Sequence, residues 1–122
     1  MSEEKISSYK KLVVWQKSMT LVVNIYEATN KFPASERFGL ISQMQRASIS
    51  IPSNIAEGSE RNTKKDFAQF IHIALGSTSE LETQIDIAFR LKFINSEKYS
   101  ELEKQVIEIK KMLVSLKLSL VR

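Results

Sequence analysis

Several residue types that commonly build functional sites are scarce in this sequence. It has no cysteine, two prolines, three glycines and one histidine among 122 residues. Without cysteine the chain cannot form disulfides, thiolate metal sites or a cysteine nucleophile, which fits the reducing cytoplasm where we expect it. A single histidine is too few for the di-iron and zinc sites that helical bundles host, so we expect no metal and no cofactor.

The sequence also lacks long apolar runs and glycine-rich loops. The N-terminal stretch MSEEKISSYKK has no apolar centre like that of a signal peptide. The longest uncharged stretch, residues 67–79, is shorter than the ~18 residues of a membrane span. Gly39, Gly58 and Gly76 lie too far apart for a phosphate-cradling loop. We therefore expect neither a membrane segment nor a nucleotide-binding loop.

Charge of neither sign dominates the chain. Lysine and arginine together number 18 against 14 aspartates and glutamates, which leaves a net charge of +4 at pH 7. The surplus is spread along the chain instead of forming one basic run. This balance permits binding to nucleic acid or to an acidic surface without demanding it.

What the sequence does have is a strongly periodic apolar pattern. Apolar residues recur at helical spacing in four stretches, about 12–30, 38–57, 63–91 and 96–121. Four long amphipathic helices with short links predict an all-α fold, an antiparallel up-and-down four-helix bundle formed by one domain over residues 1–122. For the first helix we predict a buried face, widened by a second stripe: Trp15, Met19, Val22 and Tyr26, then Val14, Leu21 and Ile25.

The second predicted helix carries Pro52 near its middle. A proline there lacks the N–H that would bond the carbonyl of Ser48, and its ring crowds that carbonyl, so we predict a bend or a restarted helix with Ser50 as its N-cap. Gly58 is predicted to end this helix in the left-handed conformation. We favour a proline-kinked structural helix over a functional site for this stretch.

Two further features indicate close contacts between helices or subunits. Gly76 lies within the third predicted helix, where its small size suits the close approach of another helix or another subunit. The fourth predicted helix carries a second apolar line beside its core-facing seam: Ile107, Val114, Leu118 and Val121. Self-association is the simplest cover for this line, and the alternative is that it widens the contact with the chain's own core.

Basic side chains gather before the first predicted helix and where the second leads into the third. Glu57, Glu60 and Asp66 lie among the latter group, so this corner is close to neutral when counted along the sequence. The candidate nucleic-acid contacts are Lys10, Lys11, Arg46, Arg61, Lys64 and Lys65.

Arg46 is set apart from the other candidates, on a polar stripe of the second predicted helix. Ser50, Asn54 and Glu57 follow it at helical spacing. Such a stripe suits a hydrogen-bonded network within or between subunits as well as a ligand surface, and we favour the network.

The residues offer little that indicates catalysis. His72 falls on the polar side of the third predicted helix and is expected to be a solvated surface residue. No arginine stands a few residues before it, as in helical ribonucleases that pair the two. Nothing in the sequence places any carboxylate in an apolar pocket with a partner. We therefore predict no catalytic residue.

Three stretches carry a likeness to a known family. They are VWQKSM, ERFGLISQMQRASISIPSNIAEGSER and KKDFAQFIHIALGSTSELETQ, which together span roughly residues 9–95. The chain resembles the bacterial four-helix-bundle family encoded in intervening sequences of large-subunit ribosomal RNA genes, often labelled a ribosomal protein. The accessory protein of diversity-generating retroelements is related to this family.

The resemblance implies a ring of five subunits, whose accessory members bind RNA and a reverse transcriptase through a basic surface. The chain departs from the family pattern at Gln45, where a second basic residue often precedes Arg46, and at Ser59, where an aromatic is common. Both departures weaken an RNA surface carried over from the family. A net charge of +4 is also low for a true ribosomal protein, so the family label does not indicate that role.

The leading hypothesis is a non-enzymatic, homo-oligomeric accessory or adaptor, a pentamer that contacts RNA or an RNA-handling protein such as a reverse transcriptase. The alternative is a protein-interaction scaffold without a nucleic-acid role, which the apolar surface favours. A helical nuclease is a third hypothesis, motivated only by His72 among polar neighbours.

Overall fold

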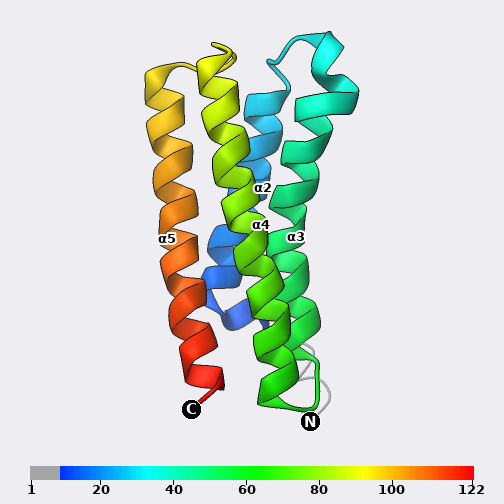
Figure 1. The fold of residues 1–122 in the computed structure, drawn as a ribbon, viewed down its shortest axis with the longest axis vertical. Helices are drawn as coiled ribbons and strands as arrows, with labels where there is room; N and C mark the ends of the chain where they lie inside the picture. Colours follow the sequence, from blue (N-terminus) through cyan, green and yellow to red (C-terminus); the bar gives the residue numbers. More distant parts are fainter. Residues whose placement is uncertain (1–8) are drawn as a thin grey trace.

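The computed structural model describes residues 9–122 as helices joined by short links (Figure 1). The long helices are α2, α3, α4 and α5, and the short helical turns are η1, η2 and η3. Their bounds are η1 Tyr9–Lys11, α2 Val13–Thr29, η2 Ala34–Glu36, η3 Arg37–Ile41, α3 Ser42–Ser59, α4 Lys64–Arg90 and α5 Ser96–Leu120. The predicted all-α fold with four long helices is confirmed.

Successive long helices run in opposite directions in Figure 1, and each packs beside the next. α4 lies between α3 and α5, while α2 closes the bundle behind by packing against α3 and α5. Three segments lie toward the lower end of the molecule in Figure 1: η1, the link from α3 to α4, and the last turn of α5. Five of the six basic residues predicted as nucleic-acid contacts belong to segments at this end.

The bundle core is formed by aliphatic side chains from all four helices. The fully buried ones include Leu21, Ile25, Met44, Ile51, Ile55, Ile71, Leu81, Ile85, Leu102, Ile109 and Leu113. Within each helix these residues recur at steps of four, seven or ten, which brings them onto one face. Their burial supplies the main favourable free energy of folding.

α2 buries the stripe that we predicted as secondary. Leu21 and Ile25 are fully buried, whereas Met19 and Tyr26 are 43% and 38% exposed. The prediction of the main face was therefore wrong for Met19 and Tyr26, whereas Trp15 and Val22 are half-buried. Small polar residues account for the difference, since buried Ser18 and Thr29 share the stripe of Leu21 and Ile25.

Both buried hydroxyls of α2 are satisfied within the helix itself. Ser18 Oγ donates to the carbonyl of Trp15 at 2.8 Å, and Thr29 Oγ1 donates to the carbonyl of Ile25 at 2.8 Å. A hydroxyl bonded to its own helix can face the core at little cost, and its small size allows close packing. A search for apolar periodicity alone does not detect such residues.

α3 continues through Pro52, which is buried inside it. Ser50 does not cap a restarted segment, and its carbonyl and hydroxyl oxygens both accept from Asn54 Nδ2, at 2.8 and 3.0 Å. A bend at Pro52 stays a prediction. The chain departs from regular helix earlier, in the π-helical turn η3, where Gly39 has φ −111° and ψ −111°.

Gly58 does not end α3 in the left-handed conformation, because no glycine in residues 9–122 has a positive φ. That prediction was wrong. Gly58 lies buried within α3, where an added Cβ would stand 2.6 Å from Cβ of Phe70 and 2.9 Å from Cδ1 of Phe67. α4 approaches α3 so closely here that only a glycine fits.

Gly76 shows the opposite situation. It is exposed on α4, and a Cβ added there would meet no atom within 4 Å among the described residues. No helix within residues 9–122 comes that close to this glycine, so the prediction that another helix of the chain approaches it was wrong. The approach of another subunit stays a prediction.

Candidate nucleic-acid interface

The fold brings five of the six predicted basic residues to one end of the bundle. Lys10 and Lys11 lie in η1, Arg61 lies in the link after α3, and Lys64 and Lys65 begin α4. These segments share the lower end of the molecule in Figure 1. Two sequence regions about fifty residues apart thus contribute basic residues to this end, where Glu60 and Asp66 also lie, in the α3–α4 link and the first turn of α4.

The lysines of this end are free of ion pairs within residues 9–122. The ion pairs formed there use Lys17, Arg61, Lys98 and Lys110 as their cations. Of the predicted contacts only Arg61 is among them. The positive charge of the four lysines is therefore not compensated by a carboxylate in contact, which leaves them able to meet an anion.

Arg61 is instead engaged with its own chain. Its Nη2 lies 3.0 Å from Glu57 Oε1, and its guanidinium stacks over the ring of Phe70 at 4.6 Å from the ring centroid. The ion pair is exposed, so it contributes little by itself. Together the two contacts hold the α3–α4 link against α4. Arg61 is therefore better explained as a structural residue than as an anion contact.

Arg46 lies away from the basic end, on α3 near Ser50 and Glu80. The predicted network along its stripe forms only in part. Ser77 Oγ on α4 donates to Ser50 Oγ at 2.8 Å, and Asn54 joins them. The Arg46 side chain makes no hydrogen bond or ion pair to any residue from 9 to 122.

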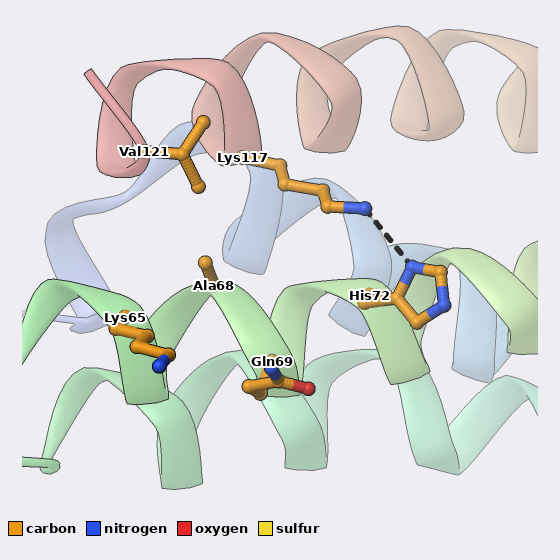
Figure 2. A pocket seen from close by; sticks show the side chains of 6 residues that line it. All are labelled: Lys65, Ala68, Gln69, His72, Lys117 and Val121. Atoms are coloured by element: carbon orange, nitrogen blue, oxygen red, sulfur yellow. Dashed lines mark hydrogen bonds between the residues drawn. The ribbon is translucent and has the colours of Figure 1, made fainter.

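A pocket at the same end of the bundle is lined mostly by residues that were not predicted as site residues from the sequence (Figure 2). It lies between the start of α4 and the end of α5 and encloses about 430 Å³. The side chains that line it are Lys65, Ala68, Gln69, His72, Lys117 and Val121. Of these, only Lys65 was predicted as a nucleic-acid contact.

Lys117 reaches across this pocket to His72, as the dashed line in Figure 2 shows. Lys117 Nζ lies 3.0 Å from His72 Nδ1. An ammonium can only donate, so Nδ1 must accept, and the imidazole is neutral with its proton on Nε2 in this arrangement. His72 is exposed as predicted, but it is a partner of Lys117 and not merely solvated.

The sequence hides this contact because the two residues lie 45 positions apart on helices that run in opposite directions. The available signal was the spacing on α4, where Lys65, Gln69 and His72 share one stripe. No arginine or carboxylate lines the pocket among the described residues. A nuclease built on His72 therefore finds no support in this geometry.

The apolar line predicted on α5 lies largely on the surface. Val114, Leu118 and Val121 are 44%, 53% and 60% exposed, and Ile107 is half-buried. Most of the line therefore does not widen the contact with the chain's own core. It remains available to another molecule.

A second polar cluster joins α4 to α5 at the opposite end of the bundle. Tyr99 Oη lies 2.6 Å from Asp86 Oδ1 and 2.7 Å from Glu103 Oε2, and the ring stacks on Phe89 at 4.5 Å. The hydroxyl has one proton, so it donates to either carboxylate. Its hydrogen bond to Asp86, followed by that to Glu103, raises the pKa of Tyr99 well above its ordinary value.

Residues 9–122 contain no group of three or more histidine, aspartate or glutamate side chains arranged to hold a metal ion. Within the same range no helix is long and apolar enough to cross a membrane. The fold defines a four-helix-bundle protein.

Comparison with known proteins places this bundle in a family. The family model described as 23S rRNA-intervening sequence protein matches residues 10–115, and the chain belongs to this family. The resemblance noted from the three sequence stretches is thereby confirmed, while the link to retroelement accessory proteins stays a prediction.

A solved structure gives the same fold. The chain is similar to a Bacteroides thetaiotaomicron VPI-5482 protein of unknown function from the S23 ribosomal protein family, with a TM-score of 0.78 and 29% sequence identity. The match covers 86% of this chain and 98% of that one. A comparison with curated proteins gave no significant match. Neither the family description nor that of the solved structure names a reaction.

Proposed function

We propose that the protein is a non-enzymatic, homo-oligomeric adaptor that binds RNA, alone or together with an RNA-handling protein such as a reverse transcriptase. The observation that carries this proposal is the basic end, where Lys10, Lys11, Lys64 and Lys65 gather without ion-pair partners among residues 9–122. Lysines without ion-pair partners bind phosphates favourably, because their binding releases the counterions that are condensed around the phosphates. The family's description also refers to ribosomal RNA genes.

Assembly makes a modest charge more effective. One chain carries +4, which is a weak electrostatic field for RNA. In a ring of five, as the resemblance implies, the basic ends of all copies would act on one RNA, and the second contact becomes intramolecular. The exposed apolar line of α5 and the uncovered Gly76 of α4 support such an assembly.

Fluorescence anisotropy of a labelled stem-loop RNA tests the proposal. We expect wild-type affinity to fall steeply between low and physiological salt. Changing Lys10, Lys11, Lys64 and Lys65 together to Gln should weaken binding and flatten its salt dependence. The matched control also removes four positive charges, from exposed lysines outside the basic end: Lys31, Lys92, Lys104 and Lys111.

Either of two results would count against the proposal. Equal losses in both quadruple variants would show that net charge matters and that the basic end is not the site. An absence of wild-type binding even at low salt would remove the RNA function altogether.

A protein-interaction scaffold is the second candidate, and the exposed apolar surface favours it. Phe38, in η3, is 91% exposed, which is unusual for so large an apolar side chain. A scaffold predicts an oligomer that binds no RNA at any salt concentration. The anisotropy experiment, combined with light scattering, therefore separates the two candidates.

A further inference from the structure

The pocket between α4 and α5 has an unusual combination of side chains. Lys65 on α4 and Lys117 on α5 both line it, and the Lys65 ammonium is drawn pointing away from α5 in Figure 2. Gln69 and His72 add polar groups, while Ala68 and Val121 supply its apolar wall. Its volume of about 430 Å³ is within the range of small-ligand sites. Its charged groups are all positive, since no carboxylate lines it.

The environment of Lys117 differs from that of the two lysines on α5 that form ion pairs. Lys98 Nζ lies 3.0 Å from Glu101, and Lys110 Nζ lies 3.2 Å from Glu82. Lys117 is half-buried, yet its ammonium is hydrogen-bonded to the neutral imidazole of His72. A neutral acceptor orients the ammonium without cancelling its charge, and it occupies one of three N–H donors. Two donors are left for an anion.

The backbone of α4 adds to this positive potential. Lys65 is the second residue of α4, so the pocket opens beside the helix N-terminus, where the peptide dipoles leave a partial positive charge. The hydroxyl of Thr63 caps one first-turn N–H, that of Asp66, at 3.1 Å. The Asp66 side chain does not line the pocket. The N-terminus of α4 thus adds to the positive electrostatic potential of the two lysines.

We propose that this pocket binds a phosphate group. Lys117 supplies the charge from the α5 side, and the flexible Lys65 side chain and the Gln69 amide are further donors on one stripe of α4. In the RNA complex the group is a backbone phosphodiester, and this part rests on the proposed function. A small phosphate in solution presents the same oxygens and fills the same pocket.

The pocket adjoins the apolar line of α5, because Val121 belongs to both. In an assembly formed along that line, a neighbouring copy would lie beside the pocket opening. Phosphates held by successive copies would then follow the ring. This places the phosphate pocket where several copies can act on one RNA strand.

The protein offers a direct reporter for phosphate binding, because His72 is its only histidine. In proton NMR of the untagged protein, the imidazole resonances report on this pocket alone. Titration with sodium orthophosphate, at fixed pH and with ionic strength held by chloride, should shift them along a saturating curve. Lys117→Gln should abolish the saturation. Lys111→Gln, an exposed lysine of the same helix, should leave it intact.

A linear shift in the wild type, or saturation that is unchanged in Lys117→Gln, would overturn the phosphate pocket. Lys117→Arg keeps the charge and should retain the saturating shift. This rescue separates a charge contact from a merely structural role. Circular dichroism and thermal unfolding show that each variant remains folded.

Anisotropy with the stem-loop RNA then separates this inference from the proposed function. We expect Lys117→Gln to bind about tenfold more weakly than Lys111→Gln, with the salt slope reduced by about one. If wild-type RNA binding is present but equal in both variants, the phosphodiester assignment fails while the RNA function stands. If orthophosphate saturates the pocket and RNA does not bind, the pocket stands and the RNA function fails.

Discussion

At the scale of single residues, the glycines of this protein serve different purposes. Gly58 is required by the close approach of α4, because a methyl group there would stand 2.6 Å from Cβ of Phe70. Gly76 meets nothing within 4 Å among the described residues and carries only the conformational cost of a glycine in a helix. Replacing glycine by alanine is therefore expected to have opposite effects on stability at the two positions.

We expect Gly58→Ala to lower the free energy of unfolding by about 1–3 kcal/mol, since forcing a side chain into a filled contact displaces α3 from α4. The gain in helix propensity is at most ~1 kcal/mol and does not offset this. Urea unfolding measures the difference. In the matched variant Gly76→Ala, the same gain in propensity should raise the stability by up to ~1 kcal/mol.

A Gly58→Ala protein as stable as wild type would show that α3 and α4 do not approach as described. A destabilised Gly76→Ala protein with a weaker oligomer would instead locate a subunit contact at this glycine. Light scattering on the same samples distinguishes that result from a local effect on the helix.

The glycines also show what a sequence can predict at this scale. Gly58, followed by a polar link, has the pattern of a helix terminator, and that pattern led to the wrong conformation. The actual reason for the glycine is the pair Phe67 and Phe70, which contact it from another helix. Such a requirement depends on tertiary packing and has no signature in the neighbouring residues.

At the scale of helices, periodicity predicted the bounds of α4 and α5 closely. It failed for the face of α2, where Ser18 and Thr29 occupy core positions with hydroxyls bonded to their own helix. The alternative of a helix restarted at Ser50 was also wrong, because α3 continues through Pro52. The apolar pattern predicts where a helix lies. It does not predict hydrogen bonds within the helix or the packing around a proline.

The contact of α4 with α5 at Tyr99 predicts a change in stability at alkaline pH. Its pKa is raised in the folded protein, first by the hydrogen bond to Asp86. As pH rises past about 10, the unfolded chain loses this proton while the folded chain keeps it. The unfolded state then binds fewer protons, so the stability contributed by this tyrosine is complete below pH 10 and declines above it.

Urea unfolding of wild type and Tyr99→Phe across this pH range measures the effect. The variant lacks the ionisable hydroxyl, so its stability should fall less steeply above pH 10 than that of wild type. Tyr26→Phe, at an exposed position on α2, is the control and should follow wild type. Parallel curves for wild type and Tyr99→Phe would contradict the hydrogen bonds assigned to this hydroxyl.

At the scale of the whole molecule, the candidate site depends on how the helices are arranged. The sequence showed the lysines near residues 10 and 64 as separate groups, one of them mixed with acidic residues. The fold joins them at one end and engages Glu57 with Arg61. Lys117 could not be predicted as a partner of this end, because only the packing of α5 against α4 brings it to His72.

The exposed apolar line of α5 gives the prediction that belongs to the assembly. Leu118→Glu places a charge on this line, where it would be desolvated in a subunit contact and harmless in a free monomer. We expect the variant to lose the oligomer and remain a folded monomer, as measured by light scattering after size-exclusion chromatography. Val23→Glu, at a 56% exposed position on α2, is the matched control and should leave the oligomer intact.

The possible outcomes separate the assembly from its contact surface. A wild-type monomer at micromolar concentration would rule out the ring itself. A wild-type oligomer that persists in Leu118→Glu but dissociates in Val23→Glu would move the contact from α5 to α2. If Leu118→Glu is monomeric and binds RNA less tightly than wild type, while its His72 resonances still respond to orthophosphate, the copies act together on RNA through pockets that each chain forms alone.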